Sequence, residues 1–286
     1  MGPQVLLIGG TGMLGAPVGR GLAQQGFQVR VLTRSVERAR ARLGDEFEFV
    51  AGNAEDVASL SAALQGCQGV HISLDGRFDP DLERRCAANV VQAARETGVQ
   101  RITYLSGASV CAENCWYAGT RAKFQAEAAL RAGDIPYTIF RCHFFMETLH
   151  NFVRGRAALH IGRHPSAYLW VAAQDFARML AVAYQTPATV DKTFYVCGPE
   201  ALTMRQALQT FCQIAHPEAR LVYLPLWLAG WIARAGRRRE LQAALPFFAY
   251  CAQATTLLSG SPDEANALLG APLTTLAAWS RLQAGR

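Results

Sequence analysis

Two hydrophobic periods alternate along most of the chain, and each period predicts a different secondary-structure element. Short apolar runs predict strands at residues 5–8, 27–34, 47–51, 69–74, 101–105, 137–141 and 193–197. Apolar positions with helical spacing predict helices at residues 56–64, 81–97, 118–132 and 174–184, and another after Thr203. Strands that alternate with such helices favour a parallel, doubly wound α/β sheet, whereas the pattern beyond residue 200 indicates mainly helices.

The first predicted strand runs directly into a glycine-rich turn, and a helical pattern follows. This order is the fingerprint of a dinucleotide-binding unit, although a plain strand–turn–helix corner has the same outline. Gly9 permits a tight turn, Gly12 lets the backbone approach a pyrophosphate, and Gly15 lets the helix pack close to the sheet. The amides and positive dipole at the helix N-terminus then face the phosphates. We expect the cofactor contacts of this turn to come from Gly9, Thr11, Gly12, Met13, Leu14 and Gly15.

The end of the second predicted strand distinguishes between two nicotinamide cofactors. A cofactor with a free ribose 2′-hydroxyl usually meets an acidic side chain there, and residues 27–34 contain none. Arg34 ends this strand, and its planar guanidinium suits the 2′-phosphate of NADP, with Arg38 one helical turn later to join it. A solvated start of a basic helix is the alternative, because Arg40 and Arg42 continue the run. The pattern favours NADP(H) over NAD(H).

Further candidate residues follow the other predicted strands. In a doubly wound sheet, ligands bind beyond the carboxyl ends of the strands, at the point where the strand order reverses. The residues just after each strand are therefore the candidates for cofactor contacts. Besides the turn and Arg34, these are Asn53, Ser73, Leu74, Ser106, Gly107 and residues 142–145.

Composition and charge agree with a chain that buries a large core around an anionic cofactor. The 286 residues are 51% hydrophobic and carry a formal net charge of +6. Basic residues are scattered apart from residues 34–42 and 237–239, and no nucleic-acid-binding motif accompanies them, so we expect no nucleic-acid partner. The eight cysteines are spread widely behind an N-terminus without a signal-peptide pattern. We therefore expect buried thiols, a reducing compartment and a cytoplasmic location.

The spacing of possible metal ligands does not predict a metal site. Cys111 and Cys115 lack a matching second pair, which structural zinc sites require. His160 and His164 lie four residues apart, but Gly162 and Pro165 argue against a stable metal-binding helix between and beside them.

One apolar stretch leaves two interpretations open. No stretch reaches the ~18 apolar residues that a membrane span needs. Residues 221–233 come nearest, with Trp227 and Trp231 four residues apart and arginines just after them. This segment either lies on a membrane surface or forms a helix that packs over a pocket, and we expect the second.

Taken together, the motifs resemble the NmrA-like family of atypical short-chain dehydrogenases. The resemblance covers about residues 4 to 210, and its motifs stand at residues 9–15, 29–34, 52–56, 104–108, 135–141, 145–147, 174–177 and 194–203. It implies a Rossmann domain that binds NADP(H), over residues 1–200, with lobe insertions possible after about residue 142. A small, mostly helical C-terminal lobe, residues 201–286, would close over the substrate.

The resemblance also implies a Tyr-x-x-x-Lys pair on the helix after the fifth strand. The tyrosine exchanges a proton with substrate, and the lysine lowers its pKa and holds the nicotinamide ribose. Lys123 stands at the lysine position, but Gly119 stands where the tyrosine is expected. Tyr117 is two residues too early, about 160° around a helix from Gly119, and reaches the site only if the helix starts later or bends. The candidate acids are Tyr117, His71 and His143, in that order.

Three functions remain open at this point. We expect an NADPH-dependent reductase of a small apolar carbonyl, enone or quinone, because the cofactor carries the hydride chemistry and water can supply a proton. The alternative is a non-catalytic regulator that senses the redox state of NADP(H) and binds a partner protein. A third is an accessory subunit that uses the cofactor structurally. The apolar substrate lobe of the first hypothesis contains Phe144, Phe145, Met146, Trp227 and Trp231.

Overall fold

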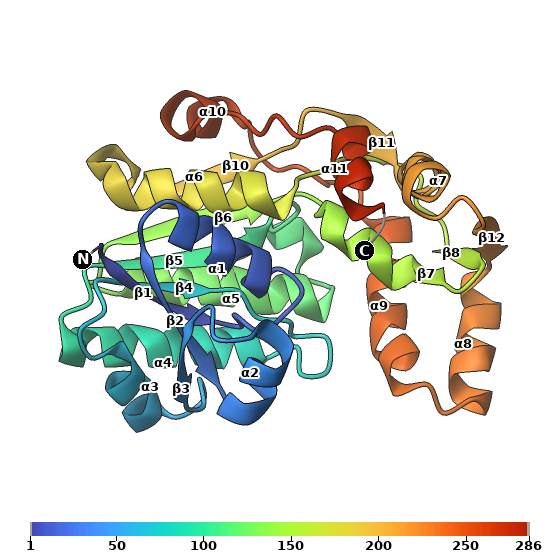
Figure 1. Cartoon of the computed structure of the whole chain (residues 1–286). Helices are drawn as coiled ribbons and strands as arrows, with labels where there is room; N and C mark the ends of the chain where they lie inside the picture. Colours follow the sequence, from blue (N-terminus) through green and yellow to red (C-terminus); the bar gives the residue numbers. More distant parts are fainter. Residues whose placement is uncertain (1, 285–286) are drawn as a thin grey trace.

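Seven parallel strands form the central sheet of the computed structural model, which describes residues 2–284 (Figure 1). Their order across the sheet is β10-β6-β5-β4-β1-β2-β3, so the strand order reverses between β1 and β4. The strands are β1 (Gln4–Ile8), β2 (Gln28–Thr33), β3 (Glu48–Ala51), β4 (Gly69–Ile72), β5 (Arg101–Gly107), β6 (Tyr137–Cys142) and β10 (Lys192–Val196). All seven correspond to strands predicted from the apolar runs. The predicted doubly wound parallel sheet is therefore confirmed.

Helices cover both faces of this sheet (Figure 1). One face carries α1 (Gly15–Gln24), α2 (Val36–Leu43) and α6 (Ala173–Gln185), and the other carries α3 (Val57–Leu64), α4 (Leu82–Thr97) and α5 (Ala118–Ala132). Along β1 the side chains alternate between the two cores, with Val5 and Leu7 in the first and Leu6 and Ile8 in the second. Both faces are buried, which is why β1 reads as a continuous apolar run.

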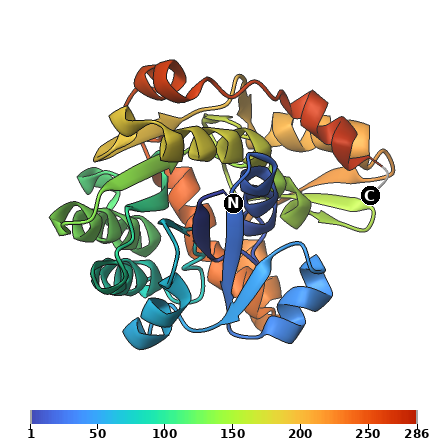
Figure 2. The same cartoon turned by 60° about the vertical axis from the view of Figure 1, so that its left-hand side comes forward.

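A second part of the chain forms a lobe beyond the carboxyl ends of the strands, as both views show (Figures 1 and 2). It contains a three-stranded sheet, β12-β8-β7, and a strand pair, β11-β9. The strands are β7 (Val153–Arg154), β8 (Ala157–Ile161), β9 (Ala167–Leu169), β11 (Ala201–Thr203) and β12 (Arg220–Leu224). The helices of the lobe are α7 (Met204–Ala215), α8 (Leu226–Ala235), α9 (Arg239–Gln253) and α11 (Leu276–Gln283), whereas α10 (Asp263–Leu269) packs against α6 and β10.

Residues before and after position 200 share the core of this lobe. Trp170 and Phe152, for example, pack in one cluster with Phe211, Phe248 and Trp279. Three short 3₁₀ turns, η1 (Ala112–Asn114), η2 (Met146–Phe152) and η3 (Pro187–Thr189), complete the chain. The division into domains 1–200 and 201–286 stays a prediction, and its outermost residues, 1 and 285–286, lie outside the described residues.

The expectation for residues 221–233 was wrong. Instead of one helix over a pocket, the segment forms all of β12 except its first residue, a break at Pro225, and most of α8. Strand β12 pairs in parallel with β8, from Arg220 opposite Ala157, and only this distant partner makes the run a strand. The side chains of Trp227 and Trp231 are 75% and 65% exposed, so they cover no pocket.

Two further expectations concern membrane spans and cysteines. Within residues 2–284, no helix combines the length and the apolar character that crossing a membrane requires. All eight cysteines are free thiols; Cys111 and Cys115 are half-buried and the other six are buried.

Candidate cofactor and active site

The parallel sheet brings the predicted cofactor residues to one edge, because all its strands end there. The loops after β1 and β4 touch at the point where the strand order reverses. The Ser73 amide donates a hydrogen bond to the Ile8 carbonyl at 2.9 Å, and a Cβ on Gly9 would lie only 1.9 Å from the Ser73 carbonyl oxygen. Gly9 therefore lies directly beside Ser73 and the adjoining Leu74 at the carboxyl ends of β1 and β4.

The glycine turn has the shape of a phosphate cradle. Gly9 has a φ of +86°, and a Cβ on Gly15 would lie 2.2 Å from the Gly9 carbonyl oxygen, so both positions require glycine. A Cβ on Gly12 would meet only that same oxygen, at 3.1 Å, which leaves open space in front of the turn. Helix α1 begins without a side-chain cap and without an acidic residue in its first turn. The Gly12 and Ala16 amides donate to the Gly9 and Gly12 carbonyls, and Pro17 has no N–H; the other amides at this N-terminus can face a pyrophosphate, and this arrangement fits a dinucleotide.

Three further residues of the turn, Thr11, Met13 and Leu14, contact neighbouring parts of the structure or are partly buried. Leu14 packs against the core of the sheet, and the Asn151 amide of η2 donates to the Met13 sulfur at 3.5 Å. Thr11 is half-buried beside them. Through the Met13 contact, the lobe touches the predicted cofactor site.

Arg34 and Arg38 are exposed at the end of β2 and in α2. Within the described part of the chain neither guanidinium has an acidic partner, whereas Arg40 pairs with Asp45 at 3.5 Å. The Ser35 hydroxyl caps α2 by accepting from the Arg38 amide. Two unpaired guanidiniums beside a strand end fit a 2′-phosphate.

Asn53 and Ser106 are both engaged in the local structure. The Asn53 side chain accepts a hydrogen bond from the Glu55 amide and shapes the loop after β3. The buried Ser106 hydroxyl donates to Glu127 at 2.6 Å, and Arg141 donates to the same carboxylate at 2.7 Å. The Ser106 hydroxyl therefore already donates its proton to Glu127, so a hydrogen bond donated to a cofactor by Ser106 or Gly107 would come from the backbone.

Tyr117 lies directly against Gly119, the position at which the family tyrosine is expected. Helix α5 begins at Ala118, and Tyr117 precedes it in an extended conformation. A Cβ built on Gly119 would lie 2.8 Å from the Tyr117 ring and 3.1 Å from its hydroxyl oxygen. The phenol thus folds over Gly119, because the helix starts after Tyr117, which is the condition that the sequence required.

Aromatic side chains of α9 cover this phenol. Tyr250 stacks on Tyr117 with ring centroids 4.6 Å apart, and Phe247 lies 6.4 Å away. Phe144, which follows β6, belongs to the same cluster. Burial, with smaller contributions from Cys251 and Tyr250, raises the pKa of Tyr117 to about 12. The phenol is therefore neutral near pH 7 and keeps a proton that it can donate.

Lys123 is held by a buried carboxylate that sequence analysis did not find. Its ammonium donates to Glu83 at 2.6 Å and to the Leu105 carbonyl at 3.3 Å. The Tyr104 hydroxyl donates to the same Glu83 oxygen at 2.6 Å. Glu83 lies in the first turn of a different helix, α4, 40 residues before Lys123, so no local spacing connects the two.

The two histidine candidates differ in position. His71 lies within β4 rather than at its end; its Nδ1 is 2.9 Å from the Thr103 hydroxyl, and burial lowers its pKa to about 3. His143 follows β6, where its Nδ1 accepts from the Leu169 amide at 2.8 Å and burial lowers its pKa to about 4. His143 is therefore a neutral imidazole near pH 7 with the proton on Nε2.

Most of the residues expected to form the apolar substrate lobe lie away from Tyr117. Phe145 and Met146 are buried in two different cores, and the two tryptophans of α8 are exposed. Of the five residues proposed, Phe144 lies in the cluster of Tyr117. The other aromatic side chains around Tyr117 are Phe247 and Tyr250. Both are far from Tyr117 in the sequence, so no local pattern predicts these contacts.

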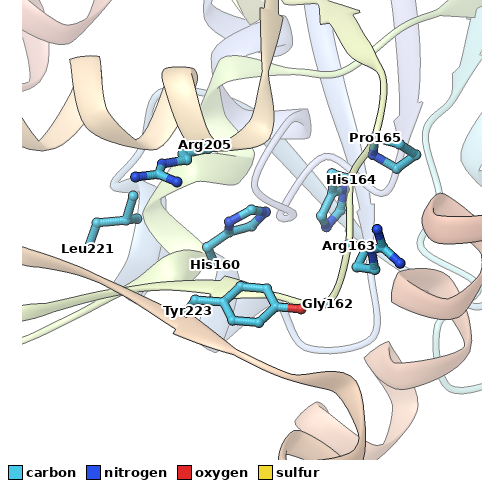
Figure 3. A pocket seen from close by; sticks show the side chains of 8 residues that line it. All are labelled: His160, Gly162, Arg163, His164, Pro165, Arg205, Leu221 and Tyr223. Carbon is cyan, nitrogen blue, oxygen red and sulfur yellow. The ribbon is translucent and has the colours of Figure 1, made fainter.

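A separate cavity of about 420 Å³ opens in the lobe (Figure 3). His160 and His164 both line it, with ring centroids 5.6 Å apart. His164 is occupied on both nitrogens, by the Tyr168 hydroxyl at 2.9 Å and the Ile161 carbonyl at 3.1 Å. The described residues include no group of three or more histidine, cysteine or acidic side chains that could hold a metal ion.

Comparison with known proteins identifies a family whose model matches most of this chain. The model of the NmrA-like family matches residues 1–274. A (4-alkanoyl-5-oxo-2,5-dihydrofuran-3-yl)methyl phosphate reductase of Streptomyces griseus is 30% identical over 205 residues, which cover 71% of this chain and 70% of the relative. The photosystem II assembly factor Ycf39 of Trieres chinensis is 25% identical over 235 residues, which cover 78% of this chain and 73% of the relative.

A solved structure has the same fold. The complex of Citrobacter sp. triphenylmethane reductase with NADP(H) superimposes with a TM-score of 0.74 and 23% identity. The match covers 98% of this chain and 99% of the other. The sheet and the lobe are thus both parts of a known architecture.

Proposed function

The chain belongs to the NmrA-like family, and on that premise we propose that it is an NADPH-dependent reductase of a small apolar carbonyl, enone or quinone. The Streptomyces griseus relative is a reductase, and the Citrobacter sp. reductase was solved with NADP(H), which supports both the reaction class and the cofactor. Family membership was also the prediction from the sequence motifs.

The residues at the carboxyl edge suit each part of this cofactor. The uncapped N-terminus of α1 and the open space before Gly12 would take the pyrophosphate, and Arg34 with Arg38 would take the 2′-phosphate. Lys123 would hold the nicotinamide ribose, with Glu83 keeping its ammonium in place. NADPH supplies the hydride when bound, and the protein orients the reactants.

The observation that carries the catalytic part of the proposal is the position of Tyr117 over Gly119. A neutral phenol there donates a hydrogen bond, or a proton, to the oxygen of a substrate that lies against Tyr250 and Phe144. Lys123 is neutralised by Glu83, and the pKa of Tyr117 stays high. Tyr117 is therefore proposed as an acid for reduction rather than as a base for oxidation.

Steady-state NADPH oxidation with an aldehyde, a cyclic enone and a quinone tests this role. We expect Tyr117→Phe to lower kcat for the aldehyde by at least about 100-fold, the scale of general acid catalysis. Gly119→Ala should do the same, because its methyl group would displace the phenol. Loss of quinone reduction should be smaller, since water can protonate that product.

Tyr250→Phe is the matched control, because it keeps the stacked ring and removes a different hydroxyl. Full activity in both Tyr117→Phe and Gly119→Ala would remove Tyr117 from catalysis. No NADPH oxidation by the wild-type protein with any substrate class would refute the reductase proposal itself.

Two observations favour a second function, a cofactor-dependent regulator or assembly protein. Glu83 binds the lysine that the family resemblance assigns to catalysis, and one relative is a photosystem II assembly factor. Calorimetric titration with NADPH and NADP⁺ separates the two proposals. Similar affinities support the reductase, whereas a strong preference for one redox state, without turnover, supports the regulator.

A further inference from the structure

Helix α8 carries one apolar stripe on its outer side. Trp227 and Trp231 are four residues apart and 75% and 65% exposed, and Arg234 continues the same stripe three residues later. We call these three residues the tryptophan face. The opposite side of α8 is buried through Ala229 and Ala233, and α8 packs against α9. Figure 1 shows α9 between α8 and the central sheet, and the burial of Ala229 and Ala233 against the exposure of Trp227 and Trp231 places the tryptophan face on the outer side of α8.

Most of the surface of these two indoles is exposed. Neither ring contacts another aromatic ring of the described chain, whereas Trp116, Trp170 and Trp279 all do. Large apolar side chains that lie exposed together mark a surface that binds something. Tryptophan in particular is enriched where an apolar phase meets water, because its ring is apolar and its N–H is polar.

Unpaired positive charge adjoins the tryptophan face. Arg234, Arg237, Arg238 and Arg239 lie at the end of α8 and the start of α9, and all four are exposed. The only acidic residue between positions 225 and 253 is Glu240. Within residues 2–284, none of the four guanidiniums pairs with a carboxylate, in contrast to Arg85 and Arg141. This end of the helical pair therefore attracts anions.

We propose that the tryptophan face and its four arginines dock on the surface of a membrane that contains anionic lipids. The indoles would enter the boundary between headgroups and acyl chains, and the arginines would meet the lipid phosphates. Helix α8 has 10 residues, half of what a span needs, so it would lie on the membrane rather than cross it. A second copy of the chain is a poorer occupant, because a two-fold contact would bring two arginine clusters together.

Sedimentation of the full-length protein with lipid vesicles tests this proposal. Wild-type protein should bind vesicles made of equal parts phosphatidylcholine and phosphatidylglycerol, and should bind vesicles of phosphatidylcholine alone much more weakly. The double variant Trp227→Ala/Trp231→Ala should lose at least tenfold in vesicle affinity. A triple Arg→Gln variant should lose a similar factor, and salt should weaken wild-type binding. Its substitutions are Arg237→Gln, Arg238→Gln and Arg239→Gln.

The matched controls remove an exposed indole, or three exposed guanidiniums, at positions outside α8 and α9. Trp116→Ala deletes an indole that is 51% exposed, and vesicle binding should not change. A second triple variant removes three exposed arginines of the lobe that lie outside α8 and α9, and it should also bind normally. Its substitutions are Arg156→Gln, Arg205→Gln and Arg281→Gln. Tryptophan fluorescence should shift to shorter wavelength on mixed vesicles, and only while Trp227 and Trp231 are present.

Several outcomes would overturn the proposal. These are no binding to mixed vesicles, equal binding to neutral and anionic vesicles, or unchanged binding in the double tryptophan variant. A dimer in solution that disappears in that variant would assign the face to a second copy instead. Because NADPH oxidation is measured separately, failure here leaves the proposed reductase function untouched.

Discussion

Lys123 has the charge that the family resemblance assigns to it, yet Glu83 neutralises that charge in the structure. For Tyr117 the reverse holds. Its place in the sequence does not match the family, but its phenol lies where a side chain at Gly119 would be. At the scale of residues, the type of a side chain predicted its chemistry. Its partners decided whether that chemistry is available.

Arg34 gives the sharpest test at this scale. We expect Arg34→Ala to weaken NADPH binding by about 1.5–3 kcal/mol, the scale of a hydrogen bond to a charged group, and to leave NADH binding nearly unchanged. The reason is that only NADPH carries the 2′-phosphate. Calorimetric titration of both cofactors measures the difference.

Arg40→Ala is the control for that experiment, because it removes a charge of the same basic run that already pairs with Asp45. It should change NADPH affinity little. An equal loss for NADPH and NADH in Arg34→Ala would place Arg34 outside the phosphate site.

At the scale of elements, the turn between β1 and α1 shows that neighbouring glycines serve different purposes. Gly9 and Gly15 are required by the backbone itself, through a positive φ at Gly9 and contacts under 3 Å at both positions. Gly12 is nearly free of such contacts. The motif therefore combines a folding requirement with a binding requirement, which the sequence pattern alone does not separate.

Substitution of these glycines should separate stability from binding. Gly9→Ala should lower the free energy of unfolding by about 1–3 kcal/mol from the strained φ alone, and further through the clash with Ser73. Gly12→Val should leave the protein folded but abolish binding of NADPH and NADH, because its side chain fills the space for the pyrophosphate. Urea unfolding and calorimetry measure the two effects. Normal cofactor binding by Gly12→Val would refute the cradle.

At the scale of the whole molecule, Glu147 connects the lobe to the sheet domain. Its carboxylate accepts from the Ala173 amide at the start of α6 at 3.0 Å, and from the Trp279 indole of α11 at 3.1 Å. Burial raises the pKa of Glu147 to about 7. The junction between the two parts of the chain therefore holds a carboxyl group that binds a proton more tightly than in the unfolded chain.

This carboxyl group predicts a pH dependence of stability. Between its ordinary pKa of 4.5 and about 7, the folded protein keeps a proton that the unfolded chain has lost, so the Glu147 contribution to stability falls as the pH rises. Relative to wild type, Glu147→Gln should therefore gain up to about 3 kcal/mol of unfolding free energy across this window. Urea unfolding at a series of pH values measures it.

Buried histidines change stability with pH in the opposite sense to Glu147. Their contribution is the same in wild type and in Glu147→Gln, so it cancels when the two proteins are compared. Burial lowers the pKa values of His71 and His143, so their contribution to stability is lost as the pH falls below 6.5. A difference between wild type and Glu147→Gln that stays constant from pH 4.5 to 8 would contradict the prediction.

The sequence by itself determined the sheet, its helices and the glycine turn, because these depend on periodicity and on backbone requirements within a few residues. Only the tertiary structure decided what surrounds Tyr117 and Lys123. Tyr250 and Glu83 reach those side chains from 133 and 40 residues away. The same holds for the segment 221–233, where pairing with β8 made a strand, and packing of α8 on α9 through Ala229 and Ala233 left Trp227 and Trp231 exposed. Contacts between distant residues depend on how elements pack, and no local pattern records them.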